Sequence, residues 1–248
     1  MEASSGLNLV LFLPAAGALA LLLVPREQRR VFEIGAFSIA LFTFVISAFM
    51  WPEFNFSDNA TFQFKTTANW IPQLAIQYKI GVDGISFALV LLTTLLSLVA
   101  ILSSWGTIRD RPREYYTCLL LLETGMLGVF VALDLVLFYV FWEAMLIPMY
   151  FLIGVWGGPR RQYATIKFVL YTLVGSLLML VAIVWVYVAT SRGGGVLPST
   201  PSAGFDLEQL TGSLSPIANG GGLDPQTRIW LFLAFASAFA IKVPMWPF

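Results

Sequence analysis

Four charged side chains fall inside long apolar stretches of this sequence: Glu123, Glu143, Lys167 and Lys242. An ionisable residue at the centre of a membrane helix costs at least about 2.5–3.5 kcal/mol on insertion scales, and such residues usually mark ion or proton pathways. Carboxyl and amine groups can take up and release protons. Their types and spacing therefore favour the movement of protons or ions over the making of bonds.

The composition indicates a membrane protein. Hydrophobic residues make up 58% and charged residues 11% of the 248 positions, against about 45–50% and about 25% in soluble domains. The 14 basic and 14 acidic residues leave no net charge to attract nucleic acid. With no His and one Cys, Cys118, the chain cannot build a bis-His haem site, a Cys/His zinc site or an internal disulfide, and it has no iron–sulfur Cys motif. We expect an all-α polytopic membrane protein with no metal or cofactor site of its own.

Seven stretches approach the roughly 20 apolar residues that a spanning helix needs. The stretch 115–156 would form a helix of about 63 Å, twice the hydrocarbon thickness, so we expect it to fold back near Asp134. We interpret residues 1–248 as a single transmembrane domain whose seventh helix is broken by Pro244 and Pro247. The predicted spans are 7–25, 31–51, 82–106, 115–133, 134–156, 163–190 and 228–248.

The connecting segments indicate an orientation. Alternating residues at 61–65 and 74–78 predict a short surface hairpin within the outer loop 52–80. The Gly-, Ser- and Pro-rich segment 191–225 is expected to be a connecting loop with one helical turn at 205–210. Lys and Arg concentrate in cytoplasmic loops, which predicts an outer N-terminus. The arginines after spans one, three and five are Arg26, Arg29, Arg30, Arg109, Arg111, Arg113, Arg160 and Arg161.

Glu143 is the strongest candidate for a proton-carrying group. It lies nine residues into the span 134–156, about 14 Å deep by helix rise. Pro148 follows five residues later and removes the amide that would bond the carbonyl of Ala144. The opened turn could admit water beside the carboxylate. The alternative is a neutral glutamic acid that is hydrogen-bonded inside the bundle.

Two lysines are further candidates. Lys242 lies beside Pro244 and Pro247, and an interrupted helix at membrane depth is tolerated only where protein or a water-filled cavity satisfies its backbone. Lys167 lies four residues into its span, near Arg160 and Arg161. For both lysines the alternative is a side chain that extends to the membrane interface.

Three acidic residues are expected to have structural or secondary roles. Asp83 directly precedes a span, as a helix N-cap does. Asp134 lies near a helix end. Glu123 lies eleven residues before Asp134, which returns to nearly the same helix face only if the helix runs through to Asp134, and we assign Glu123 no transport role. Cys118 is expected to be a packing residue.

Three motifs resemble one known family. They are Gly-Val-Asp-Gly-Ile-Ser at 81–86, Phe-Trp-Glu-Ala-Met-Leu-Ile-Pro-Met-Tyr at 141–150 and Ala-Ile-Lys-Val-Pro-Met-Trp-Pro-Phe at 240–248. In this order they are similar to the antiporter-like subunits of respiratory complex I. The Trp-Glu…Pro-Met-Tyr wording is most similar to the chain M branch, called subunit 4 in mitochondria.

The resemblance implies a proton-translocating NADH:quinone oxidoreductase of the bacterial inner membrane. Glu143 and Lys242 match the family's coupled ion pair, within inverted repeats that each contain a broken helix. The chain would be a non-redox subunit of this translocase. NADH, FMN, iron–sulfur clusters and quinone would be bound by partner subunits. Its partners would be the other antiporter-like subunits and the peripheral redox arm.

Family members continue beyond the Pro-Phe pair, so we expect this chain to be the N-terminal part of a longer protein.

Two other functions remain open. Subunits of Mrp-type cation/proton antiporters and of membrane-bound hydrogenases share the same Glu and Lys positions. A passive scaffold is the third interpretation, although a scaffold has little need for a deep Glu and a Lys in a proline-broken helix.

Overall fold

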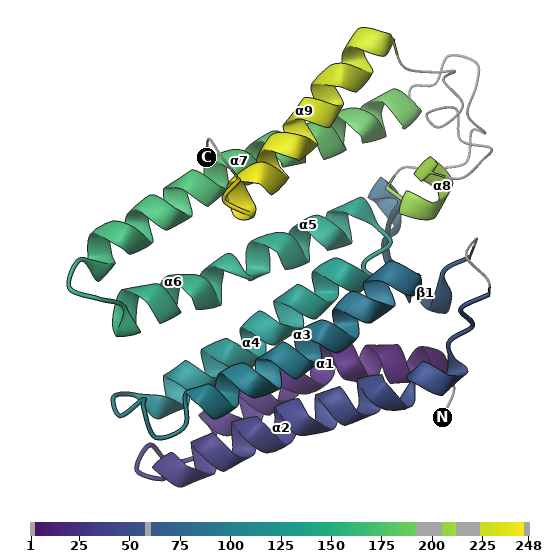
Figure 1. Cartoon of the computed structure of the whole chain (residues 1–248). Helices are drawn as coiled ribbons and strands as arrows, with labels where there is room; N and C mark the ends of the chain where they lie inside the picture. The colour runs from purple at the N-terminus through teal and green to yellow at the C-terminus, as the bar shows by residue number, and fades with distance from the viewer. Residues whose placement is uncertain (1–2, 58–60, 192–204, 212–223, 246–248) are drawn as a thin grey trace. The chain divides into compact units, whose positions relative to one another are not determined.

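The computed structural model describes residues 3–57, 61–191, 205–211 and 224–245. The described chain is mostly helical, and six of its helices are long and apolar enough to cross a membrane. Figure 1 shows the course of the chain, which forms two compact units. The first comprises Met1–Thr66, Ile80–Ala132 and Phe141–Trp156, and the second comprises Thr67–Lys79, Leu133–Val140 and Gly157–Phe248. The assignment of residues 1–248 to a single domain stays a prediction.

The first unit is built on four helices that lie side by side (Figure 1). They are α1 (Ala3–Leu22), α2 (Arg29–Phe49), α3 (Gly84–Ser103) and α4 (Pro112–Val131). Alanines of α2 let the neighbouring helices approach closely. The core packs Ala36 and Ala40 with Phe32, Ala18, Leu21, Ile101, Tyr116 and Leu120.

Two of these helices begin with clear start signals. The predicted N-cap at Asp83 is confirmed. Its side chain accepts from the backbone N–H of Ser86, and the Ser86 hydroxyl accepts from the backbone N–H of Asp83. α4 begins with Pro112, directly after Arg111 in a left-handed conformation. A proline is tolerated in the first helical turn because its missing amide has no helical partner there.

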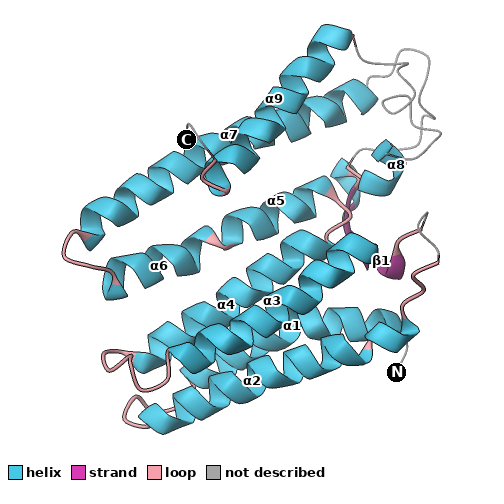
Figure 2. Ribbon diagram, in the orientation of Figure 1, coloured by secondary structure: helices cyan, strands magenta, loops and turns pink. Residues whose placement is uncertain are grey.

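The fifth predicted span, 134–156, is two helical segments rather than one helix. α5 covers Leu135–Ala144 and α6 covers Leu146–Trp156, and Figure 2 draws the interruption as a short loop. Pro148 has no amide to offer the carbonyl of Ala144, so the helix is interrupted within the turn before it. Together the two segments form one of the six candidate spans.

In the second unit, α7 (Arg161–Ser191) packs along α9 (Pro225–Lys242), as Figure 1 shows. A Cβ atom at Gly175 would lie 2.9 Å from Ile241 Cδ1, so glycine permits this approach. α9 ends at Lys242, and Pro244 follows with a φ of 22°. α9 therefore ends before Pro244, whereas the broken seventh helix stays a prediction and Pro247 lies outside the described residues. α9 is not among the six candidate spans, so a seventh span stays a prediction.

A two-stranded sheet forms in the predicted hairpin region. β1 covers Gln63–Ile71 and β2 covers Ile76–Val82, and a single 3-10 turn at Pro72–Leu74 joins them. Ala75 closes this turn with a φ of 54°. A second 3-10 turn, Trp51–Glu53, follows α2. The hairpin's place on a membrane surface stays a prediction.

α4 packs closely on the segment 141–156, so a larger side chain at Gly128 is expected to destabilise the first unit. A Cβ atom there would overlap the ring of Phe141. We expect Gly128→Ala to destabilise the first unit by about 1–3 kcal/mol, the range typical of overpacking, and to lower the melting temperature of the purified protein. Gly158→Ala is the control, because nothing lies within 4 Å of its added Cβ. Equal melting temperatures of the two variants would contradict this packing.

Candidate functional site

The helix that carries Glu143 is held at its start by Asp134. One carboxylate oxygen of Asp134 accepts from the backbone N–H groups of Val136 (2.9 Å) and Leu137 (3.1 Å). The other accepts from the N–H of Gln77 at 3.1 Å. Burial raises the pKa of Asp134, while these three backbone bonds act to lower it. Asp134 therefore caps α5 and ties it to β2.

Glu143 lies at the end of α5, directly before the interruption. Its side chain is half-buried, and its Oε1 atom is fully buried without a hydrogen-bond partner among the described residues. Pro148, which frees the carbonyl of Ala144, is also buried. An unpaired carboxyl oxygen beside an opened helical turn is a place where water or a second polar group can bind.

Lys242 is the last residue of α9, and its side chain is half-buried. A lysine at this position is favoured by the negative end of the helix dipole. Glu143 belongs to the first unit and Lys242 to the second, so their pairing stays a prediction.

Lys167 lies on an exposed face of α7. Its Nζ atom is 5.8 Å from the ring centroid of Tyr163, one helical turn earlier, which is within the range of a cation–π interaction. This contact is compatible with a lysine that extends towards an interface, and a role in a proton relay stays a prediction.

Three charged side chains of the second unit form a hydrogen-bonded cluster. Lys79, in β2, donates from Nζ to both carboxylate oxygens of Asp206 (2.9 and 2.7 Å) and to Glu208 Oε2 (2.9 Å). The side chain of Lys79 is 10% exposed and that of Asp206 5%. We call this ion-pair cluster of Lys79, Asp206 and Glu208 the clasp.

Backbone hydrogen bonds run through the same region. The N–H of Leu133 donates to the carbonyl of Lys79 at 2.8 Å, and the N–H of Leu207 donates to the carbonyl of Leu133 at 2.9 Å. Asp134 and Asp206 form an antiparallel bridge. The chain before α5 thus lies between the end of β2 and the segment that starts α8 (Leu207–Thr211). This part of the segment 191–225 is a structured contact rather than a simple connecting loop, and the helical turn predicted at 205–210 is confirmed.

The clasp keeps Lys79 charged. Burial lowers the pKa of Lys79, but hydrogen bonds and attraction from Asp206 and Glu208 outweigh it, so the pKa is raised. A lysine with a raised pKa stabilises the fold fully below its unfolded value of about 10.4, and this contribution is lost as the pH rises through the folded value. The clasp should therefore be intact at neutral pH.

Lys79→Met is expected to loosen the backbone contacts made by Leu133 and Leu207. Removing one partner of a buried ion pair typically costs about 3–5 kcal/mol, because the other charge stays buried without compensation. Amide hydrogen exchange at Leu133 and Leu207 should accelerate strongly in the variant. In the wild type the contribution of Lys79 should not change between about pH 6 and 9. Lys65→Met, an exposed position on the same hairpin, is the control, and equal exchange in both variants would contradict the clasp.

The sequence analysis missed this cluster and one further buried acid, Glu33 in α2. Glu33 Oε1 accepts from Arg29 Nε at 3.0 Å and lies 3.4 Å from the backbone nitrogen of Gly106. The sequence did carry a signal for the helical turn that follows Asp206, since Asp206 and Gln209 have the spacing of a helix capping box. Lys79 carried no such signal, because its partner lies 127 residues away.

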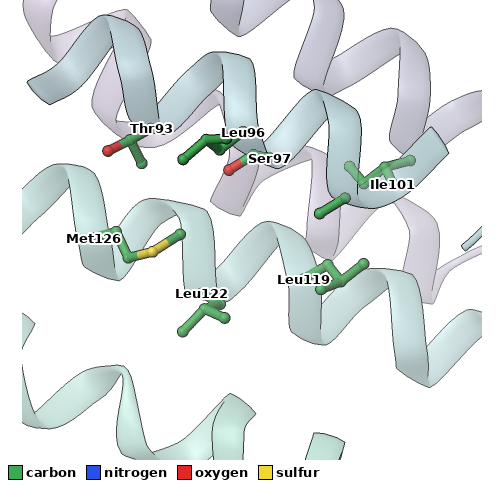
Figure 3. A pocket seen from close by; sticks show the side chains of 8 residues that line it. Thr93, Leu96, Ser97, Ile101, Leu119, Leu122 and Met126 are labelled. Atoms are coloured by element: carbon green, nitrogen blue, oxygen red, sulfur yellow. The ribbon is translucent and has the colours of Figure 1, made fainter. Parts of the chain in front are cut away.

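An apolar cavity of about 210 Å³ lies between α3 and α4. Figure 3 shows its lining, in which the only side-chain oxygens are those of Thr93 and Ser97. Among the described residues no acidic or basic side chain lines it.

The cysteine and histidine content limits the clusters that this chain could bind. An iron–sulfur cluster needs about four cysteine thiolates, and the chain has one Cys and no His. Among the described residues no group of three acidic, Cys or His side chains could hold a metal ion. Protonatable carboxyl and amine groups are present at Glu123, Glu143, Lys167 and Lys242.

Two family models match consecutive parts of the chain. Residues 19–132 match the amino terminus of NADH-ubiquinone oxidoreductase chain 4, and residues 132–248 match the transmembrane part of the NADH:quinone oxidoreductase/Mrp antiporter family. Together the matches run from residue 19 to residue 248. The chain belongs to the antiporter-like membrane subunits of NADH:quinone oxidoreductase. The sequence resemblance is thereby confirmed.

The relatives of this antiporter-like chain are about twice as long. NADH-quinone oxidoreductase subunit M of Rhodobacter capsulatus is 42% identical over 245 residues, which cover 97% of this chain and 46% of the relative. A chain of respiratory complex I from Thermus thermophilus is 30% identical, with a TM-score of 0.76 over 97% of this chain and 44% of that one. The Mrp complex from Dietzia sp. DQ12-45-1b shares the fold at 20% identity, with a TM-score of 0.74 over 95% of this chain and 23% of that one.

Proposed function

We propose that this chain is part of a proton-translocating membrane subunit of a complex I-type NADH:quinone oxidoreductase. The observation that supports this most strongly is the position of Glu143 in a member of this family. Its carboxyl group lies at the end of α5, beside a proline-opened turn, with a buried oxygen that has no partner among the described residues. A buried carboxyl in such a place can hold and release a proton.

Glu143 and Lys242 are proposed to control one another's protonation. Two unit charges 4 Å apart interact by about 4 kcal/mol at an effective dielectric constant of about 20. This energy corresponds to about three pKa units. When the pair is close, the ammonium favours the carboxylate; when it separates, Glu143 takes up a proton and Lys242 gives one up. A modest movement could therefore transfer protons at neutral pH. Lys167 is proposed as a third relay residue.

The driving chemistry is proposed to lie in partner subunits. NADH oxidation needs flavin and iron–sulfur clusters, and quinone reduction needs a quinone site; this chain has the ligands for none of the clusters. We propose that it assembles with other antiporter-like subunits and the peripheral redox arm in a bacterial inner membrane. The concentration of arginines after spans one, three and five supports an outer N-terminus.

Purification of the native complex tests the assignment. We expect the full-length protein to co-purify with NADH-oxidising subunits that contain flavin and iron–sulfur clusters. Sealed vesicles that hold the complex should acidify when NADH and quinone are supplied, without a requirement for sodium. A preparation free of NADH-oxidising subunits would contradict the proposal.

The second candidate is a subunit of a multi-subunit cation/proton antiporter or membrane-bound hydrogenase. It is favoured by the family description, which includes Mrp antiporters, and by the shared fold of the Dietzia complex. Sodium-dependent proton exchange without NADH would support this function. A passive scaffold predicts unchanged turnover and pumping when Glu143 and Lys242 are both replaced by apolar residues.

A further inference from the structure

Glu123 is buried in the middle of the first unit, and the proposed relay does not use it. It lies on α4 with an exposed fraction of 0%. Its neighbours along the same helix face are Tyr116, Leu120, Leu127 and Val131, which are at most 1% exposed. This face packs into the α1–α4 core that contains Ala18 and Ala40.

Neither carboxyl oxygen of Glu123 has a hydrogen-bond partner among the described residues. An isolated ionised carboxylate in an apolar interior is prohibitively costly, and such a group is held as the neutral acid instead. Even the neutral acid needs partners, because a buried polar group without them costs about 1–3 kcal/mol. Buried polar atoms that find no protein partner are commonly bonded by internal water.

α1 packs on α4, and the register of the two helices places a second polar group without a helical partner at about the level of Glu123. Arg113, near the start of α4, donates to the carbonyl of Leu22 at the end of α1, so the two helices run antiparallel. Glu123 lies ten residues along α4 from Arg113, and Phe12 lies ten residues back along α1 from Leu22. Glu123 and Phe12 are therefore at about the same level of the two helices. This register is good to about one helical turn.

The level of Phe12 is where α1 has a free backbone acceptor. Pro14 is buried within α1 and has no amide, so the carbonyl of Val10 loses its helical hydrogen bond. Val10 is 1% exposed. A water molecule could accept a hydrogen bond from the carboxylic O–H of Glu123 and donate one to the Val10 carbonyl, which would give each group a partner.

The Glu123 position is separate from that of Glu143. Gly125 and Gly128 mark the side of α4 that meets Met145 and Phe141, since an added Cβ atom would overlap both residues. At 100° per residue, Glu123 is about 200° from Gly125 and about 140° from Gly128. Its side chain therefore starts from the face of α4 that is turned away from the segment 141–156.

We propose that Glu123 is a protonated carboxylic acid with a bound internal water, forming a second proton-holding site inside the α1–α4 bundle. The site is distinct from the apolar cavity between α3 and α4, because Glu123 does not line that cavity. The proposal does not depend on the relay through Glu143 and Lys242.

Infrared spectroscopy of the intact complex tests the protonation state. Glu123→Gln keeps the shape of the side chain but cannot hold an acidic proton. We expect the wild type to show one carboxylic acid C=O band that is missing in Glu123→Gln and that shifts on transfer to D₂O. Glu53→Gln, at an exposed position, should leave this band unchanged. Identical wild-type and Glu123→Gln spectra, or the loss of a carboxylate band instead, would overturn the proposal.

The wild-type complex provides a test that needs no variant. A density map that resolves waters should show one within hydrogen-bond distance of the Glu123 carboxyl. A dry site in such a map, or a C=O band that fails to shift after prolonged exposure to D₂O, would overturn the bound water. Failure of the Glu143 prediction would change none of these results.

Discussion

Glu143→Gln in the complete complex is expected to lower NADH-driven proton pumping by about a hundredfold, which is within the usual contribution of a positioned proton-transfer group. Glutamine occupies the same volume at the end of α5 and can still donate hydrogen bonds. It cannot accept a proton at neutral pH, so the relay would stop while the fold is kept. Pumping is measured as acidification of sealed vesicles on addition of NADH.

The controls separate chemistry from assembly. Glu143→Asp keeps the carboxyl group one methylene further back and should retain part of the pumping. Glu53→Gln removes an exposed carboxyl outside the relay and should pump normally. NADH oxidation with a water-soluble electron acceptor should be the same in all variants, because it reports the peripheral arm. Near-normal pumping by Glu143→Gln would rule out the proposed role of Glu143.

Lys242→Arg and Lys242→Met are expected to abolish pumping to a similar extent. Methionine removes the charge at the end of α9. Arginine keeps the charge but cannot lose its proton in a protein, since its pKa lies above 12. If Lys242 must release a proton in each cycle, a permanent cation is as harmful as no cation.

The comparison of these two variants decides what Lys242 does. Substantial pumping by Lys242→Arg together with loss in Lys242→Met would show that only the positive charge matters, which contradicts proton release. Normal pumping by both would remove Lys242 from the relay. Lys65→Met, at an exposed position of β1, is the matched loss of a lysine and should not change pumping. All three variants are compared at equal amounts of assembled complex.

Much of the helical architecture could be predicted from local sequence. Pro148 predicted an opened turn next to Glu143, where the structure interrupts the helix, and Pro244 predicted an irregular backbone near Lys242, where α9 ends. Asp83 predicted the start of α3. Each of these features depends on backbone groups within about one helical turn. The count of seven spans was less secure, because α9 is less apolar than the six helices that qualify.

The candidate site was only partly predictable. Glu143 was found because a charge within an apolar run is visible without any knowledge of the fold. The exposed face of Lys167 on α7 could not be inferred in the same way, because which side of a helix is covered depends on its neighbours. Asp134 was assigned to a helix end, but its bond to Gln77 joins residues 57 positions apart.

The sequence by itself determined the membrane class, most helix positions and the helix ends near Pro148 and Pro244. These properties follow from hydropathy and from residues adjacent in the chain. Only the tertiary structure decided that Lys79 pairs with Asp206 and Glu208, and that Glu123 is buried in the α1–α4 core, where neither carboxyl oxygen has a hydrogen-bond partner among the described residues. The physical reason is that the energy of a buried charge or polar group depends on its surroundings in space, which chain folding brings together from distant segments.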